Sequence, residues 1–454
     1  MFTSISRFLL YLVPLSVLAV ATTTFFPFIG IKYYVFRLLV TGAVLAFLCG
    51  WAFEGEPVSL RKRLLPFLKS PLGIGVTAFV VAFLLACFFG VDPHGSFWSN
   101  FERGEGGFQM IHYYLFLVML ILTMTERKHW YMFFGISAVA GLLAIGYGVL
   151  AALDPRQFIG TYQELSDQGL WYALTHTRFQ GSLGNAAYVA PYLMFIGGFL
   201  TILWLHIEKN WIRTTLFGLT IFLYGLFFIL SQTRAAFLGL VVALGVGLIY
   251  ILLRSRVKKY AIGALALFVV LLGVLFAFRN TDAIRSIPAA RVLAISTQER
   301  TVQTRLWNWG AAWKGFKERP VFGWGPEAYP IVFDRHFDPR HFLPNASSET
   351  WFDRAHSVVF DYLAETGLVG FLAYVAMLVT LMYTLLRYVF ASAATTVTDT
   401  VFHAVLIALP VGYGVQALAL FDVLPVFMNL MVFAGFVYYL AHSSRKSHEH
   451  ATNR

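Results

Sequence analysis

RNTDAIRSIPAARVLAIS (residues 279–296) opens the stretch that decides the fold. It continues as QERTVQTRLWNWGAAWKGFKERPVFGWGPEAYP (298–330) and closes as SSETWFDRAHSVVFDYLAETGLVG (347–370). Most of the remaining chain is apolar, whereas this stretch carries charged residues at the density of a soluble protein. Ionised side chains in membrane hydrocarbon cost several kcal/mol, so we expect an extramembrane loop. Its many aromatic residues argue against disorder. We therefore predict a small folded cap that carries the chemistry.

The composition indicates an integral membrane protein. Of the 454 residues, 58% are hydrophobic and only 13% are charged, against roughly 25% charged in a typical soluble domain. The net charge of +11 would suit a nucleic-acid partner, but the basic residues form short clusters between apolar runs. Such clusters set the orientation of membrane helices, so we expect no nucleic-acid binding.

Twelve apolar runs are each long enough, at about twenty residues, to cross a bilayer. They lie near 8–29, 33–53, 71–90, 108–125, 131–152, 185–206, 214–231, 235–253, 260–278, 367–387, 401–420 and 426–441. We therefore predict an all-α polytopic membrane protein with about twelve transmembrane helices and one large, mainly helical outer loop. Residues 1–278 would hold helices 1–9, 279–366 the catalytic loop, 367–441 helices 10–12, and 442–454 a cytoplasmic tail.

The first run also has features of a signal peptide, namely Arg7, an apolar centre and a small-residue site at Ala19-Val20-Ala21. The apolar tract continues to Gly30, however. We therefore favour an uncleaved first helix.

The orientation follows from the short loops. Basic clusters fall in alternate connections and in the tail, at 61–63, 127–128, 209–213, 254–259 and 445–446. Because Lys and Arg accumulate on the cytoplasmic side, these loops and both termini are expected there. The opposite side would hold the segments 91–107, 154–185, 231–234, 279–366 and 421–425.

Four outer arginines are candidates for binding an anion, because a guanidinium group makes two-pronged contacts with phosphate and carboxylate. Arg178 begins the Gly-rich segment RFQGSLGN, and Arg305 lies in the cap segment TRLWNWGAAW. Arg103 lies in the first outer loop. Arg234 follows SQT at the tight corner between the seventh and eighth runs.

Arg234 is the strongest of these candidates. Its position predicts a helix N-terminus, where free N–H groups and the positive end of the helix dipole favour a bound anion. The alternative is an arginine that reaches to the membrane interface without binding a ligand. The position alone leaves both interpretations open.

His356, in DRAHSVVFDYLAETGLVG, is the leading candidate for a general base. We expect His356 or Ser357 to begin the first turn of a helix, where the dipole lowers the pKa of the imidazole and favours the neutral form that accepts a proton. The alternative is a histidine that caps the helix or packs beneath the loop. Histidine itself is not specific here, since others lie on or near the outer side: His94, His112, His176, His336 and His341.

The segment GWGPEAY (323–329) predicts a turn, because Gly-x-Gly-Pro permits a tight reversal. It is not a nucleotide-binding loop, since no GK[ST] follows it. Its Trp324 and Tyr329 are candidates for substrate contact. Asp422, between the last two runs, could orient a cation or a sugar hydroxyl, although an exposed loop residue is the simpler interpretation.

Taken together, these segments resemble the O-antigen ligase and O-antigen polymerase superfamily of bacterial envelope glycosyltransferases, which includes protein O-oligosaccharyltransferases. One motif is Arg234 with Leu238 in SQTRAAFL. The other is His356-Ser357, then nine residues, then GLVG (367–370), which is similar to the histidine motif of the ligases. RFQGSLGN, TRLWNWGAAW and PVFGWGPEAY are similar to family segments as well. The resemblance covers the chain from about Arg178 onward.

The resemblance implies a GT-C-like fold in the bacterial inner membrane, with the site on the periplasmic face. It implies transfer of a glycan from a polyprenyl diphosphate, such as undecaprenyl diphosphate, to a hydroxyl of a lipid, glycan or protein acceptor. The family's base falls on His356, and its essential arginines fall on Arg234 and Arg305, with Arg178 a weaker match. No DxD-like motif is present, so we expect no metal and no cofactor.

Three alternatives stay open. A polymerase would use the same donor with a second lipid-linked glycan as acceptor, and a protein O-oligosaccharyltransferase would use a protein. The histidine motif favours a ligase or an O-oligosaccharyltransferase over a polymerase. From a different class, a transporter or lipid flippase would be expected to bury ionisable groups within its spans, whereas the centres of these runs are almost free of charge.

The topology is testable. With reporter enzymes fused after residue 258 or 446, we expect activity only of the reporter that works in the cytoplasm, because both sites follow Lys/Arg-rich loops. A reporter exported at either site would contradict the predicted orientation.

Overall fold

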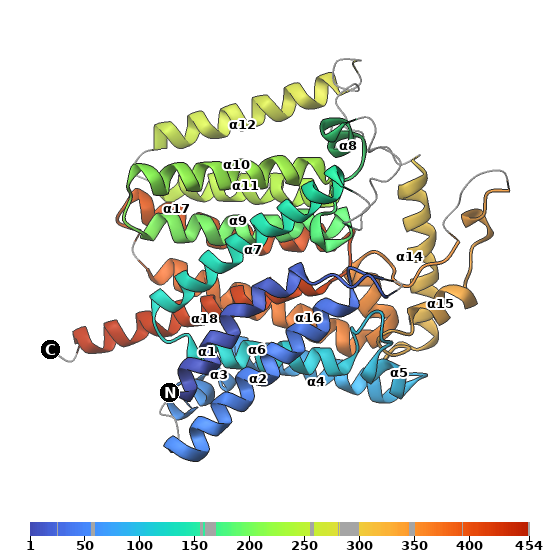
Figure 1. The fold of residues 1–454 in the computed structure, drawn as a ribbon, viewed down its shortest axis with the longest axis horizontal. Helices are drawn as coiled ribbons and strands as arrows, with labels where there is room; N and C mark the ends of the chain where they lie inside the picture. Colours follow the sequence, from blue (N-terminus) through green and yellow to red (C-terminus); the bar gives the residue numbers. More distant parts are fainter. Residues whose placement is uncertain are drawn as a thin grey trace.

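The computed structural model describes the chain except residues 25, 56–59, 155–157, 159–168, 255–257, 280, 282–298, 345–349, 393 and 453–454. The described residues form long helices and contain no strand. Most of these helices run side by side in a bundle, with the cap (residues 279–366) at one end and both termini at the other (Figure 1). The predicted all-α polytopic fold is confirmed.

The long helices of the bundle are α2 (Gly30–Glu54), α4 (Pro71–Phe89), α6 (Gly107–Thr123), α7 (Arg127–Leu153), α9 (Ala186–His206), α10 (Trp211–Leu230), α11 (Arg234–Arg254), α12 (Lys258–Phe278), α16 (Val358–Ala391), α17 (Val397–Ala417) and α18 (Leu424–Thr452). The cap contributes α14 (Arg300–Glu318), α15 (Tyr329–Arg335) and η6 (Pro339–His341). The shorter elements are α1 (Phe2–Leu12), η1 (Val13–Leu18), η2 (Leu60–Leu64), α3 (Leu65–Leu68), α5 (Pro93–Trp98), α8 (Leu170–His176) and η4 (Gly181–Leu183).

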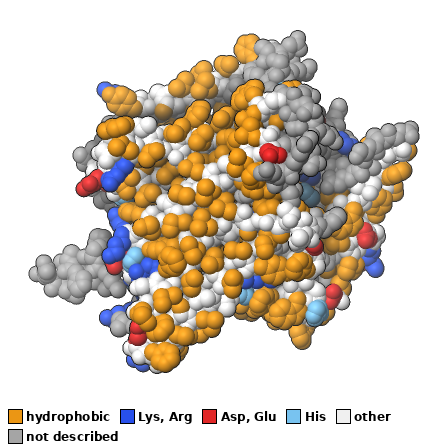
Figure 2. Space-filling model, viewed as in Figure 1, with side chains coloured by type: hydrophobic (Ala, Val, Ile, Leu, Met, Phe, Trp, Pro, Cys, Tyr) orange, Lys and Arg blue, Asp and Glu red, His pale blue; other side chains and the backbone are white. Residues whose placement is uncertain are grey.

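Of the described helices, ten are long and apolar enough to cross a membrane, and two shorter apolar helices, Phe2–Leu18 and Gly107–Thr123, stand where the first and fourth spans were expected. Every expected span therefore has a helical counterpart. Figure 2 shows the matching surface, a broad hydrophobic band with charged side chains mainly toward its ends. A band of this kind is what lipid contact requires.

The first expected span, 8–29, is wrong in its position. α1 ends at Leu12, and the chain continues as the 3₁₀ helix η1 only to Leu18. Pro14 explains the change, because proline has no N–H to donate and its ring clashes with the preceding turn of an α-helix. Residues 22–24 and 27–29 then form turns and bends before α2 begins at Gly30.

α18 is the centre of the bundle, with 89% of the residues in its apolar stretch buried, whereas none of the described residues in the apolar stretch of α12 is buried. Large aromatic side chains fill the core around it, including Trp130, Phe133 and Phe134. Helix pairs approach closely where small residues meet. A side chain on Gly239 of α11 would touch the carbonyl oxygen of Gly412 on α17. Without a hydrophobic driving force between helices in lipid, such close packing is a main source of their association.

The cap has a hydrophobic core of its own, built from Ala311, Ala312, Trp324, Ala328, Tyr329, Val332, Phe333, Phe352, Ala355 and Ala364. α14 and α15 contribute half of these side chains, and Ala364 belongs to α16. The final part of the cap is therefore the outer end of the same helix that enters the bundle. The helix that contains the expected span at 367–387 therefore begins earlier than predicted, at Val358.

The cap docks on α16 at a break in that helix. Gly367 has a left-handed backbone (φ 63°), and on either side of it α16 exchanges backbone hydrogen bonds with the segment 320–325. Trp324 N donates to Ala364 O at 2.9 Å, and Leu368 N donates to Pro320 O at 2.8 Å. Gly323 (φ 71°) lies against this break, where a Cβ would come within 2.5 Å of the Glu365 carbonyl carbon. Both glycines are therefore required by backbone contact.

We expect Gly367→Ala to destabilise the protein by roughly 3 kcal/mol, because alanine is strained at positive φ and its Cβ would lie 2.6 Å from Gly323 N. Thermal unfolding in detergent measures the effect. Gly310→Ala on α14 is the control, since nothing lies within 4 Å of its Cβ position, and it should leave stability unchanged or slightly higher. Equal melting temperatures for the two variants would contradict this account of the break.

Candidate active site

Arg354 is the most highly connected charged residue at the outer end of the bundle. Its guanidinium pairs with three carboxylates from distant parts of the chain. Glu365 on α16 lies at 2.7 Å, Glu105 before α6 lies at 2.6 Å, and Glu327 of the turn before α15 completes the set. Only 7% of Arg354 is exposed. The three carboxylates hold the pKa of this guanidinium well above its ordinary value, against the effect of burial.

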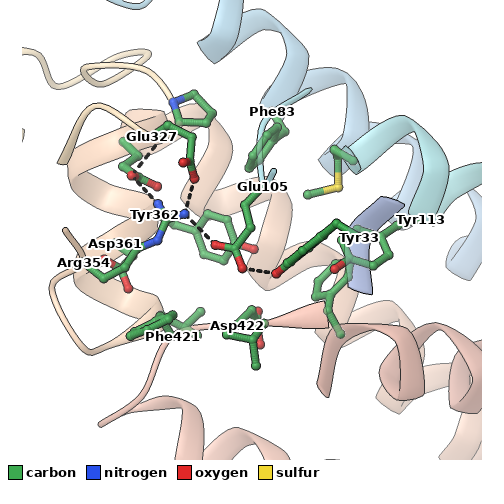
Figure 3. Close-up of a pocket in the computed structure, with 16 residues that line it drawn as sticks. Tyr33, Phe83, Glu105, Tyr113, Glu327, Arg354, Asp361, Tyr362, Phe421 and Asp422 are labelled. Atoms are coloured by element: carbon green, nitrogen blue, oxygen red, sulfur yellow. Dashed lines mark hydrogen bonds and ion pairs between the residues drawn. The ribbon is translucent and has the colours of Figure 1, made fainter. Parts of the chain in front are cut away.

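A cavity of about 70 Å³ opens beside this cluster (Figure 3). The three glutamates line it together with two further carboxylates, Asp361 and Asp422. Aromatic side chains complete its wall: Tyr33, Phe83, Tyr113, Tyr362, Phe421 and Phe427. Pockets with apolar walls and a few convergent polar groups are the usual places for ligands.

Asp361 fixes the backbone next to the cavity. Its Oδ1 accepts a hydrogen bond from Ala355 N at 2.6 Å. The next residue, His356, has a left-handed backbone with φ 58°, which is uncommon for a residue other than glycine. Helix α16 then begins at Val358, whose N–H donates to Leu420 O at 3.0 Å. The carboxylate and the helix start therefore hold His356 in a conformation that it would rarely adopt otherwise.

Ser357, one of the two expected starting positions, is the N-cap of α16, whereas His356 lies two residues before the helix, so its expected place in the first helical turn is wrong. Its Nδ1 is 3.1 Å from the carbonyl oxygen of Arg354. Because a carbonyl can only accept, Nδ1 is the donor, and in the neutral ring Nε2 carries the lone pair. The ring packs edge-on against Phe352 and Phe421, with centroids at 5.5 Å and 5.2 Å.

Burial is the main cause that lowers the pKa of His356 to about 4. The hydrogen bond to Arg354 O acts in the opposite direction, and the positive charges of Arg305, Arg103 and Arg354 act in the same direction as burial. The expected neutral form is therefore favoured, but chiefly by burial and not by a helix dipole. A neutral imidazole at pH 7 with a free lone pair can accept a proton.

Two of the four predicted arginines lie near His356. Arg305 on α14 and Arg103 of the first outer loop both act on its pKa. Arg103 forms an ion pair with Asp353 and lies over the Phe26 ring at 5.3 Å. The loop and the cap thus bring two guanidinium groups toward the same imidazole.

Arg178 and Arg234 meet at the corner between α10 and α11. Arg178 Nε donates to Ser231 O at 3.3 Å, and its Nη2 donates to Thr233 Oγ1 at 3.2 Å. Arg234 begins α11, as the sequence predicts. The corner is left-handed at Gln232 (φ 52°). RFQGSLGN therefore lies against SQTR, which places both predicted arginines in one region.

Arg234 also makes a two-pronged ion pair with Glu299, the residue before α14. The two side chains are 29% and 30% exposed. A carboxylate thus occupies the fork that was predicted to bind an anion. This contact agrees with an anion-binding geometry at Arg234.

Trp324 and Tyr329 lie in the cap core and do not line the cavity, so their expected contact with substrate is not supported. Trp324 Nε1 donates to Gly315 O at 2.9 Å. Tyr329 is fully buried, and its hydroxyl donates to the carbonyl oxygen of Asn308 at 2.9 Å. Asn308 Nδ2 in turn donates to Arg354 O at 2.9 Å. Tyr329 therefore supports, through Asn308, the carbonyl that binds His356.

The simpler interpretation of Asp422, an exposed loop residue, is wrong. Its carboxylate accepts hydrogen bonds from Tyr413 at 2.9 Å to each oxygen, and it lines the cavity. Burial raises its pKa to about 7, although the hydrogen bonds from Tyr413 and Tyr374 act in the opposite direction. Asp422 is thus partly charged near neutral pH.

The sequence reasoning missed Arg354 and its carboxylate partners, which all lie within motifs that it singled out for other residues. One signal was available. Asp361 and Glu365 stand four apart in the apolar segment VVFDYLAETGLVG, a spacing that puts both on one face of a helix. Two carboxylates on one face of an apolar helix require a polar partner. Among the described residues, no three His, Cys, Asp or Glu side chains are grouped so as to hold a metal ion.

The helix bundle and the cavity beneath its cap define a polytopic α-helical membrane protein with a polar cavity of about 70 Å³ at one end. Residues 219–375 match the family model of O-antigen ligase. The predicted resemblance to the O-antigen ligase superfamily is therefore confirmed. The matched range contains Arg234, Arg305, Arg354 and His356. No curated protein matches the chain.

We expect Arg354→Met to destabilise the protein by about 3–5 kcal/mol, since it leaves three buried carboxylates without their cation. Arg354→Lys should lie between this variant and the wild type, because a lysine cannot contact all three partners at once. Thermal unfolding in detergent provides the comparison. The control is Arg340→Met, which removes a pair with Asp338 in which the Arg340 side chain is 66% exposed, and it should have little effect on the melting temperature. Similar losses of thermal stability in the Arg354 and Arg340 variants would show that the buried cluster contributes no more to stability than an exposed ion pair.

Proposed function

We propose that this protein transfers a glycan from a polyprenyl diphosphate to the hydroxyl of an acceptor, as an O-antigen ligase does, on the outer face of a bacterial inner membrane. The observation that carries the proposal is His356 within the matched range. It is a largely buried neutral imidazole with its lone pair on Nε2, near Arg305 and Arg103. A base beside cations suits the deprotonation of an acceptor that attacks a substrate with an anionic leaving group.

In the proposed reaction, Nε2 of His356 takes the proton of the acceptor hydroxyl. The acceptor oxygen forms a bond to the anomeric carbon of the donor sugar. The bond between that carbon and the diphosphate oxygen breaks, and the polyprenyl diphosphate leaves with the electron pair. A single direct displacement inverts the configuration at the anomeric carbon.

Arg234, Arg305 and Arg178 would stabilise the departing diphosphate, with Arg103 close by. Guanidinium groups and the N-terminus of α11 can stabilise the growing negative charge. The ion pair with Glu299 would have to open for Arg234 to reach a phosphate. The donor phosphates would then take the place of the Glu299 carboxylate as the anionic partner of Arg234.

The decisive experiment is reconstitution of the purified protein in lipid vesicles with a polyprenyl-diphosphate glycan. Lipid-linked sugar, glycan and protein acceptors are supplied in parallel. Transfer to a sugar acceptor supports a ligase, elongation of the donor glycan supports a polymerase, and a modified protein supports an O-oligosaccharyltransferase. No transfer to any acceptor, with bound donor demonstrated, would refute the proposed function.

His356→Ala should lower transfer by about 10²–10⁴-fold while donor binding persists, because only the base is lost. In the wild type, kcat/KM should fall as the pH drops through the free-enzyme pKa of about 4, since protonation removes the lone pair. The acidic limb of kcat should lie higher, because the negative charge of a bound diphosphate raises the pKa of the imidazole. A folded His356→Ala protein with near wild-type transfer would contradict the assignment of His356 as the general base.

Arg234→Lys should lower transfer about tenfold and Arg234→Ala about a hundredfold, because lysine keeps the charge but loses the fork. Glu299→Gln should tighten donor binding, since it removes the carboxylate that competes for Arg234. Steady-state transfer and binding of the radiolabelled donor measure these effects. Full activity in an Arg234→Ala protein that inserts normally would exclude a diphosphate contact at this position.

A further inference from the structure

We propose that the cavity beside Arg354 is the acceptor subsite. Its carboxylates would select a ring that carries hydroxyl or ammonium groups and reject one that carries an anion. This inference rests on the proposed function and specifies the acceptor of the same site.

The charge of the cavity is the first argument. Five carboxylates line it, from Glu105, Glu327, Asp361, Glu365 and Asp422, against the single guanidinium of Arg354. Even with Asp422 neutral, carboxylates outnumber cations. An anionic ligand would be repelled strongly in such a partly buried space, where electrostatic interactions are weakly screened. The diphosphate therefore does not belong here, and none of Arg178, Arg234 and Arg305 lines this cavity.

An unused acceptor atom is the second argument. The guanidinium group of Arg354 is paired with the three glutamates. Asp361 is only 5% exposed and its Oδ1 is occupied by Ala355 N, but no donor among the described residues reaches its Oδ2. A buried carboxylate oxygen without a partner costs free energy. A hydroxyl or ammonium group of a ligand would supply the missing donor.

The wall of the cavity is the third argument. Phe83 and Phe421 face the same space as the carboxylates (Figure 3), and Phe427 also lines the cavity. A sugar ring combines apolar C–H faces with hydroxyl donors at its edge. Aromatic faces together with carboxylate acceptors match both parts of such a ring, whereas a lipid chain would leave the carboxylates without donors.

The cavity also borders the proposed base. Phe421 lines the cavity and contacts the His356 ring edge-on at 5.2 Å. Arg354 lines the cavity, and its carbonyl oxygen binds His356 Nδ1. A ring held by the carboxylates would therefore lie next to the imidazole that removes its proton.

Binding of three methyl glycosides to the detergent-purified full chain tests whether the cavity selects its ligand by charge. The probes are methyl glucoside, methyl glucosaminide with its ammonium group, and methyl glucuronide with its carboxylate, compared by calorimetry at one ionic strength. We expect the glucosaminide to bind about tenfold more tightly than the glucoside, because an ammonium group donates a stronger hydrogen bond than a hydroxyl group does. The glucuronide should bind at least about tenfold more weakly than the glucoside. Equal affinities, or tightest binding of the glucuronide, would overturn the proposal without any variant.

Asp361→Asn assigns the effect to this cavity. Asparagine keeps the oxygen that accepts from Ala355 N and replaces the unused oxygen with a donor. The advantage of the glucosaminide over the glucoside should then disappear. Asp334→Asn, an exposed carboxylate on α15 of the same cap, is the matched control and should leave the order unchanged. An unchanged order in a folded Asp361→Asn protein would refute the subsite.

The transfer assay separates this inference from the proposed function. Transfer that proceeds equally well to neutral, ammonium-bearing and anionic acceptor rings would refute the subsite while the transferase assignment stands. A charge-ordered binding of the glycosides without transfer to any acceptor would refute the transferase and leave a sugar-binding cavity.

Discussion

The outer end of this protein depends on the burial of one guanidinium group. Arg354 draws together the loop before α6 through Glu105, the turn before α15 through Glu327, and α16 through Glu365. A buried charge is tolerated only when its partners satisfy it, and removal of one partner leaves the others exposed to the full cost of desolvation. The ion cluster therefore specifies how the cap sits on the bundle. Its backbone carbonyl then orients His356, so the same residue links the architecture to the proposed chemistry.

A second constraint acts through the backbone. At Gly367 the helix α16 breaks, and the segment 320–325 docks on both sides of the break. Gly323 and Gly367 approach so closely that neither position leaves room for a side chain. This contact fixes the cap in the direction along α16, while the ion cluster fixes it across the helix. Both contacts join the cap to the most rigid part of the molecule, a long helix packed into the bundle.

Positive and negative charges are sorted around His356. Arg103 and Arg305 lower the pKa of His356. Arg178 and Arg234 lie together at the corner between α10 and α11. The carboxylates instead gather within the cavity. In a space that excludes much of the water, fixed charges act strongly and need little reorganisation during a reaction. In the proposed reaction, this arrangement would hold the anionic leaving group and the hydroxyl-bearing acceptor at separate positions.

The sequence by itself determined the helical polytopic class, the position of nearly every long helix, and the start of α11 at Arg234. These features follow from the length of apolar runs and from local rules for helix ends, which act over a few residues. It also pointed to His356, through its predicted position near a helix start and through the family resemblance. Local rules failed at the first span, where Pro14 outweighed the apolar composition.

Only the tertiary structure decided which charges meet. The cavity is assembled from residues near positions 33, 105, 327, 354–365 and 422, and no periodicity or spacing relates such distant segments. It likewise placed Trp324 and Tyr329 in the cap core and Asp422 in the cavity, the reverse of what their loop positions suggested. The physical reason is that burial and partner choice are set by packing between elements. A sequence pattern reports which side chains can be ionised, whereas the fold decides which of them lose their water and find an opposite charge.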